Sequence, residues 1–178
     1  MGNKALMRKL TRYMAWADDV MLRNAEQLPV PELTAQRDTL FGSINGTFDH
    51  VLLVGQVFRA HLEGRPHDFT SRHPTKNRSF AMVAEELRAL NAFYVDLSDR
   101  MDPTDLKDVV RFTFIGGGQG SMSREEILLH LVNHATYHRG FVSTLIFPFR
   151  VSGQANDLTV FLRDVWPDLV RTDPSLVP

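Results

Sequence analysis

Apolar residues recur every three or four positions along several long stretches of the chain, which is the spacing of amphipathic helices. The first stretch runs from Lys4 to Leu28 and ends at Pro29. A second runs from Thr39 to Glu63, and a third from Ser79 to Met101. We expect each of these stretches to form a helix that turns one apolar face towards the core.

The next helix has a clear start signal. Ser123-Arg-Glu-Glu126 is a capping box, in which the side chains of the serine and the glutamate each accept a hydrogen bond from the other residue's backbone N–H. The apolar periodicity continues from there to Phe147. Pro148 follows, and a proline in a helix interior removes a hydrogen bond and clashes with the preceding turn. We therefore expect a helix from Ser123 to Phe147.

Two segments between the helices lack helical periodicity. Residues 64–78 are polar and rich in turn-forming residues, so we expect a loop there. Val109–Ile115 is rich in β-branched and aromatic residues and precedes a cluster of glycines. We expect this segment to be a strand that turns at Gly116–Gly120 and forms a short β-hairpin.

The C-terminal part is expected to be less regular than the rest. Pro148–Gln154 should form a loop, and a short helix should begin near Asn156 or Asp157 and break at Pro167. The last residues, RTDPSLVP, are expected to fray. Together the elements predict an all-α fold, a four-helix bundle with a short β-hairpin insertion and a short C-terminal helix. With no internal repeat and no linker, residues 1–178 are expected to form one domain.

Composition excludes several classes of function. The chain has no cysteine, which rules out a disulfide scaffold, a cysteine nucleophile and cysteine-ligated zinc. Its formal net charge is -1, from 20 basic and 21 acidic residues, so we expect no nucleic-acid partner. No apolar run approaches the roughly 18 residues of a membrane span, and the first residues lack a signal-peptide core. We therefore expect a cytoplasmic protein without a membrane partner.

Histidines form the most informative pattern in the chain. His130, His134 and His138 lie four residues apart on the predicted helix that follows the capping box. Four residues advance a helix by about 400°, so the three side chains form a stripe that drifts slowly around it. Neighbours in such a stripe can converge on one metal ion. A solvated histidine stripe is the alternative interpretation.

A metal site needs a further ligand from elsewhere in the fold. His50 lies in an apolar stretch of the second predicted helix, where a buried imidazole needs a partner for each nitrogen. His61 shares its helix face but lies about 16 Å further along, too far to bind the same ion. His67 and His73 fall in the predicted loop and should be solvated. Spacing alone leaves the third ligand open.

The chain resembles the DinB family of DinB/YfiT-like metalloproteins in its segment LLHLVNHATYHRG. Further resemblance lies in RYMAWADDVM for the first helix, LFGSINGTFDHVLLVGQVF for the second and NDLTVFLRD for the last. The resemblance implies a bundle of up-down-down-up type that binds one divalent transition metal through His50, His134 and His138. It also implies a homodimer, and zinc or nickel as the metal. Imidazole ligands suit iron as well.

Other residues are candidates for supporting these ligands. His130 is a less usual member of the stripe, and we expect it to sit beside the metal ligands rather than replace one of them. Tyr137 and Arg139 are further candidates, with helix packing as their alternative role. Ligating histidines often donate their second N–H to a carboxylate, and Asp18 and Asp19 on the first helix could supply one.

Three imidazoles would leave a coordination position open, which is typical of a catalytic metal. The resemblance therefore implies a metal-dependent enzyme of thiol S-transferase-like or hydrolase-like type. Its substrate would be a small molecule, with a low-molecular-weight thiol as one specific form. The alternative is a non-enzymatic metal-binding stress-response protein with a structural metal, in keeping with the damage-inducible founding member of the family. The sequence names no catalytic residue and no substrate.

Overall fold

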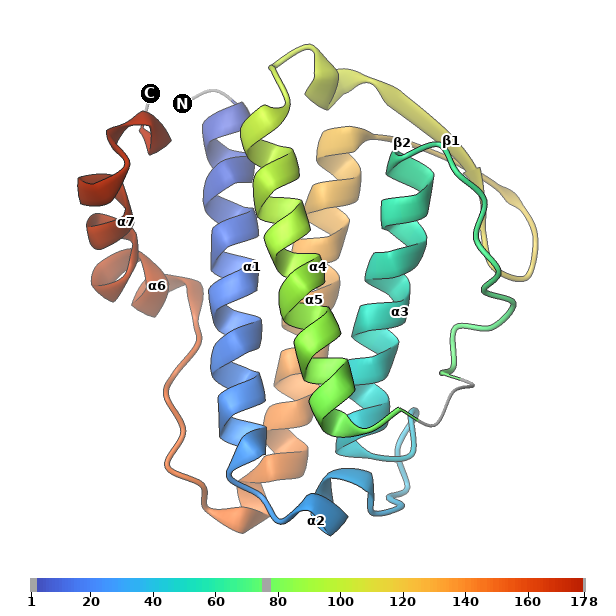
Figure 1. Cartoon of the computed structure of the whole chain (residues 1–178), viewed down its shortest axis with the longest axis vertical. Coiled ribbons are helices and arrows are strands. Elements are labelled where there is room, and N and C mark those ends of the chain that lie inside the picture. Colours follow the sequence, from blue (N-terminus) through green and yellow to red (C-terminus); the bar gives the residue numbers. More distant parts are fainter. Residues whose placement is uncertain (1–2, 75–77, 178) are drawn as a thin grey trace.

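Four long helices form the body of the molecule, shown in Figure 1. The structure is a computed structural model and describes residues 3–74 and 78–177. Its elements, in chain order, are α1 (Asn3–Glu26), α2 (Val30–Thr34), α3 (Ile44–Leu62), α4 (Phe80–Arg100), η1 (Asp105–Lys107), β1 (Val109–Thr113), β2 (Gln119–Ser123), α5 (Arg124–Ile146), η2 (Phe147–Phe149), α6 (Leu158–Asp164), α7 (Trp166–Thr172) and η3 (Pro174–Leu176). The predicted bundle with a β-hairpin is confirmed, whereas α2 and η1 were not anticipated.

The helices follow an up-down-down-up order. In Figure 1, α1 and α5 run in one direction, and α3 and α4 both run in the other. The connection from α3 to α4 therefore has to travel the length of the bundle. α1 packs on α4 and α5, and α3 packs on the same two helices. Among the described residues, no helix combines the length and the apolar character needed to cross a membrane.

Capping residues set where the long helices begin. Ser123 accepts from the backbone N–H of Glu126 at 3.2 Å, and the Glu126 carboxylate accepts from Ser123 N–H at 2.7 Å, so the predicted capping box is confirmed. The prediction that the second helix begins at Thr39 was wrong. Gly42 has a φ of +71°, which a helix does not allow, and the Ser43 hydroxyl caps a helix that begins at Ile44.

The predicted hairpin is confirmed, with shorter strands than expected. β1 and β2 pair antiparallel, with Val109 opposite Ser123 and Thr113 opposite Gln119. The turn uses three glycines with positive φ, Gly116–Gly118, a conformation that glycine adopts at little cost. Gly120 belongs to β2 and not to the turn, because it pairs with Phe112.

The expected helix break at Pro167 was wrong. α6 ends earlier, at Asp164, and α7 begins at Trp166 with Pro167 in its first turn. Proline is tolerated there because the first N–H groups of a helix have no partner within the helix. Pro167 therefore helps to start a helix instead of ending one.

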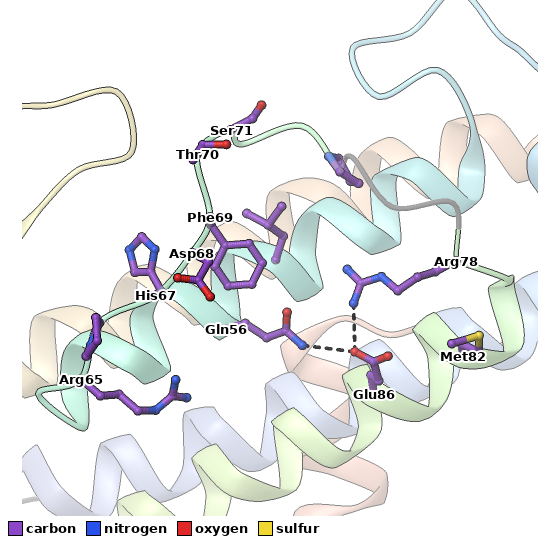
Figure 2. Close-up of a pocket in the computed structure, with 13 residues that line it drawn as sticks. Gln56, Arg65, His67, Asp68, Phe69, Thr70, Ser71, Arg78, Met82 and Glu86 are labelled. Atoms are coloured by element: carbon purple, nitrogen blue, oxygen red, sulfur yellow. Dashed lines mark hydrogen bonds and ion pairs between the residues drawn. The ribbon is translucent and has the colours of Figure 1, made fainter.

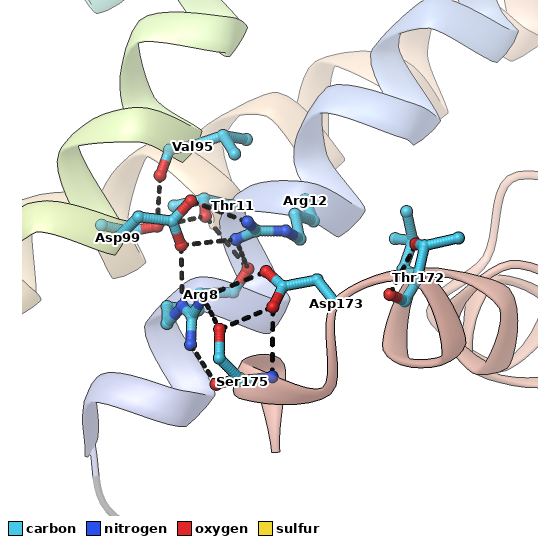
Figure 3. Close-up of polar contacts among 10 residues, drawn as sticks. Arg8, Thr11, Arg12, Val95, Asp99, Thr172, Asp173 and Ser175 are labelled. Atoms are coloured by element: carbon cyan, nitrogen blue, oxygen red, sulfur yellow. Dashed lines mark hydrogen bonds and ion pairs between the residues drawn. The ribbon is translucent and has the colours of Figure 1, made fainter. Parts of the chain in front are cut away.

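The expectation of a frayed tail was also wrong for the residues described. Leu176 is buried in the core, and Arg8 of α1 donates to the backbone oxygen of Ser175. Asp99 of α4 accepts from Arg8 Nε and from Arg12 Nη2, the contacts drawn in Figure 3. Each of the two distances is 2.7 Å. An arginine cluster thus joins the tail to α1 and α4.

Candidate metal centre

Imidazoles from two neighbouring helices converge inside the bundle. His50 lies in the first half of α3, and His134 and His138 face it from α5. The Nε2 atom of His134 lies 3.2 Å from Nε2 of His50 and 3.1 Å from Nε2 of His138. One ligand atom from each of the three residues lies within 4.8 Å of the others. In the part of the chain that the structure describes, this is the group of side chains able to hold a metal ion.

The protons of these imidazoles can be assigned in part from their partners. His50 Nδ1 lies 2.7 Å from the carbonyl oxygen of Arg72, which can only accept, so Nδ1 carries the proton. A neutral His50 then presents a lone pair at Nε2. His134 Nε2 lies between two nitrogens and holds at most one proton. At least one of the two close N···N contacts therefore has no hydrogen bond, and a cation bound by the lone pairs would remove this conflict.

The spacing of the nitrogens suits a transition metal. A Zn–N bond of about 2.0–2.1 Å places two ligand nitrogens roughly 3.3–3.4 Å apart in tetrahedral geometry and about 2.9 Å apart for adjacent octahedral ligands. The two separations that involve His134, 3.1 and 3.2 Å, lie between these values, and the ligand atoms of all three residues lie within 4.8 Å of one another. Imidazole ligands bind zinc, nickel, copper and iron. The residues present therefore fit a divalent transition metal without choosing among these ions.

Burial keeps the three imidazoles in the form that binds metals. Burial, with a smaller contribution from the neighbouring imidazoles, lowers the pKa of His134 to about 3 and that of His138 to about 4. Burial also lowers the pKa of His50, although the bond to the Arg72 carbonyl opposes this effect. Desolvation disfavours the charged imidazolium. All three rings are therefore neutral near pH 7, with lone pairs free to bind a cation.

A phenylalanine outside the predicted site covers the imidazoles. The Phe41 ring stacks on His50 with centroids 4.0 Å apart and meets the edge of His138 at 5.5 Å. The sequence placed Phe41 inside a predicted helix, and no local signal marked it as part of the site. His138 Nδ1 is buried and has no hydrogen-bond partner within the described residues. Its ring is therefore held by packing on Phe41 and its neighbours.

The expectation that Asp18 or Asp19 supports a ligand was wrong. Asp18 is buried and accepts from Arg139 Nη1 at 2.6 Å and from Asn91 Nδ2 at 2.9 Å. Asp19 accepts from Arg88 Nε at 2.7 Å. Both carboxylates therefore hold positively charged or amide side chains of α4 and α5 and not an imidazole.

The other residues predicted to support the ligands are Arg139, Tyr137 and His130, and they occupy three different positions around the site. Arg139 is buried, and its hydrogen bonds go to Asp18, Tyr13 and Thr136, which places it against α1. Tyr137 is 69% exposed, with its ring edge-on to His138 at a centroid distance of 5.0 Å. The His130 ring lies 5.6 Å from the His134 ring, beside the group of three and outside it.

The remaining histidines lie outside the group of three. His61 stacks on Phe112 of the hairpin, with ring centroids 4.7 Å apart. His73 is exposed, as expected for a loop residue. His67 is half-buried, so its expected solvation was wrong, because its ring packs on His61 at 5.1 Å.

A cavity of about 510 Å³ opens beside the three imidazoles. We call it the imidazole cavity, and it is lined by His50, Val54, Val57, Phe58, His61, Arg72, Phe112, Phe114, Ile115, Met122, His130 and His134. Two of the converging histidines, His50 and His134, form part of its wall. A small molecule in this cavity could therefore approach a metal held by the three rings.

A second hollow, of about 540 Å³, lies between α3, α4 and the loop that follows α3. We call it the loop cavity, and its lining includes Gln56, Arg78 and Glu86, shown in Figure 2. Arg78 and Gln56 both donate to the Glu86 carboxylate, at 2.9 and 3.2 Å, and Arg78 also pairs with Asp49. The single positive charge of Arg78 is thus shared between two carboxylates, and none of the three converging histidines lines this cavity.

The chain is similar to known proteins over most of its length. A model of the DinB family matches residues 1–159. Protein DinB of Bacillus subtilis is 23% identical over 161 residues, which cover 86% of this chain and 92% of that protein. A solved DinB-like protein from Bacillus cereus has a TM-score of 0.61 at 19% identity, covering 81% of this chain and 91% of that one. A conserved protein from Enterococcus faecalis has a TM-score of 0.54 at 15% identity, covering 83% and 99%.

Proposed function

Because the chain belongs to the DinB family, we propose that His50, His134 and His138 bind one divalent transition metal and present it to a small-molecule substrate in the imidazole cavity. The observation that carries the proposal is the convergence of three histidines, two of which, His50 and His134, lie in the wall of that cavity. Zinc and nickel are the first ions to test, followed by iron.

The chain's own residues prepare this site in three ways. The Arg72 carbonyl holds the proton of His50 on Nδ1, so that Nε2 is free to bind. Phe41 stacks on His50 and limits the access of water to it. The four-residue spacing of His134 and His138 places both side chains on one side of α5. When bound there, a divalent metal supplies a Lewis acid that polarises a substrate oxygen or lowers the pKa of a bound water or thiol.

This chemistry supports transfer to or from a small thiol, or hydrolysis of a small substrate. Three protein ligands leave room for a substrate atom, and the imidazole cavity gives that atom a path of approach. A purely structural ion is the second candidate, because the ligands join α3 to α5 and would tie the two helices together. The two candidates differ in how strongly folding depends on the ion.

Metal analysis of untagged protein tests the proposal directly. The wild type is saturated with zinc or nickel and then freed of excess ion. It should retain about one ion per chain, as measured by elemental mass spectrometry. His134→Ala should retain almost none, because it removes the nitrogen that lies between the other two. His61→Ala is the matched control, a histidine of α3 outside the group of three, and should retain as much as the wild type. A wild type that takes up neither ion would overturn the proposal.

A further inference from the structure

A row of aromatic rings leads from the three imidazoles to the tip of the hairpin. The His130 ring lies 5.6 Å from His134 and 5.0 Å from Phe58, measured between centroids. The Phe112 ring lies 5.6 Å from Phe58 and 5.1 Å from Phe114. These side chains all line the imidazole cavity. The cavity therefore has a continuous aromatic wall that starts at a candidate metal ligand.

The hairpin supplies two rings of this wall, Phe112 and Phe114, and a glycine makes room for the first of them. Gly120 pairs with Phe112 across the two strands, and a Cβ atom at Gly120 would lie 2.4 Å from the Phe112 ring. Glycine at this position lets the ring lie across β2. Phe114 follows at the end of β1 and is 50% exposed, so a large apolar side chain stays available at the outer end of the wall.

The charges around the cavity favour one class of ligand head group. Within residues 3–74 and 78–177, no acidic side chain lines the imidazole cavity, whereas Arg72 and several imidazoles do. The loop cavity differs, since Asp68 and Glu86 lie in its wall. A cationic ligand would find no counter-charge in the imidazole cavity, and an anionic or neutral one would meet no repulsion from a carboxylate.

We propose that the imidazole cavity selects small apolar molecules, aromatic ones above all, that carry an anionic or neutral metal-binding head group. The head group lies at His50 and His134, and the apolar part lies against Phe112 and Phe114 of the hairpin. The cavity volume of about 510 Å³ is in the usual range for small-molecule sites. The inference rests on the proposed function, because the head group needs the metal.

Two hydroxamates that share a head group test this inference. Acetohydroxamate carries a methyl group and benzohydroxamate a phenyl ring, and their affinities for zinc-loaded protein are measured by calorimetry. Benzohydroxamate should bind at least about tenfold more tightly, because its ring is removed from water. Phe114→Ala should reduce this ratio several-fold and leave both the zinc content and the acetohydroxamate affinity unchanged. Phe147→Ala, an 82% exposed phenylalanine outside the cavity lining, is the matched control and should keep the ratio.

The outcomes separate this inference from the proposed function. Equal affinity for the two hydroxamates, with zinc still bound, overturns the inference and leaves the proposed function standing. Benzohydroxamate with an added aminomethyl cation on its ring should bind more weakly, and equal binding overturns the charge selectivity.

If the protein takes up no metal, the proposed function fails, and the aromatic wall is tested without metal. The aromatic anion 1-anilinonaphthalene-8-sulfonate is then titrated into the wild type and Phe114→Ala. Binding several-fold weaker in the variant supports the wall as the binding surface. Equal binding overturns it.

Discussion

The Nδ1 atom of His50 lies 2.7 Å from the backbone carbonyl oxygen of Arg72, and this contact assigns the proton of the imidazole. Arg72 belongs to the connection between α3 and α4, which passes along the bundle because both helices run in the same direction. The chain topology therefore brings a carbonyl group to a histidine of the site. Ligating histidines commonly donate their second N–H to such a carbonyl.

Metal binding should raise the melting temperature of the wild type and not that of His50→Ala. An ion at a hundred times its Kd stabilises the folded state by about 2.7 kcal/mol. For a chain of this size that corresponds to roughly 5–10 °C. Differential scanning calorimetry with and without zinc measures the shift. His61→Ala should shift as much as the wild type, and an equal shift in His50→Ala would contradict the ligand assignment.

The amount of stability that the protein loses when the metal is removed distinguishes a catalytic ion from a structural ion. If the ion serves chemistry, wild-type protein stripped by a chelator should still unfold cooperatively with its core intact, because the long helices bury a continuous apolar core of their own. If the ion is structural, the stripped protein should lose its cooperative transition. Near-ultraviolet circular dichroism during heating distinguishes the two results.

Acid should destabilise the metal-free protein through its buried imidazoles. The pKa of His134 is about 3 and that of His138 about 4 in the folded chain, against an ordinary value near 6.5. Below about pH 6.5, His134 and His138 bind protons in the unfolded chain but stay neutral in the folded chain. The free energy of unfolding, which is highest above pH 6.5, therefore falls as the pH drops towards 4. Each such proton contributes a slope of about 1.4 kcal/mol per pH unit.

Urea unfolding between pH 7.5 and 4.5 measures this loss. The double variant His134→Ala/His138→Ala should show a shallower slope than the wild type, because it lacks both groups. A double variant as steep as the wild type would show that other groups cause the acid sensitivity.

Breaking the buried ion pair of Asp18 and Arg139 should destabilise the fold without removing the metal. Both side chains are only 4% exposed, so Asp18→Ala leaves a buried arginine without its carboxylate. Such a change costs about 3–5 kcal/mol. Asp168→Ala breaks an exposed pair with Arg171 and should cost less than about 1 kcal/mol. Urea unfolding measures both costs. If folded Asp18→Ala binds less metal than the wild type, the ion pair is not independent of the metal site.

Two glycine-to-alanine changes should have opposite effects on stability. In Gly120→Ala the new Cβ atom would meet the Phe112 ring at 2.4 Å, so the ring has to move, at a cost of about 1–3 kcal/mol. In Gly140→Ala the new Cβ atom of α5 has nothing within 4 Å, and the change should stabilise by up to about 1 kcal/mol. Thermal unfolding of both variants tests the pair. A neutral Gly120→Ala would show that the Phe112 ring is free to shift.

Local sequence determined the elements and part of the site. Ser123 and Glu126 form the predicted capping box because both partners lie within one helical turn. The four-residue spacing of His134 and His138 directs both side chains to one side of α5 for the same reason. Periodicity placed the long helices to within a few residues, except where Gly42 and Ser43 delay the start of α3.

The tertiary structure decided what surrounds the metal ligands. His50 is 84 residues from His134 in the chain, and histidine spacing within one helix does not determine which histidine of another helix faces it. The Arg72 carbonyl, the Phe41 ring and the aromatic wall of the hairpin come from other segments again. Leu176 is likewise buried beside Ser175, whose backbone oxygen accepts from Arg8 of α1. Such contacts depend on how the helices pack together, and the periodicity within each helix carries no information about its partner.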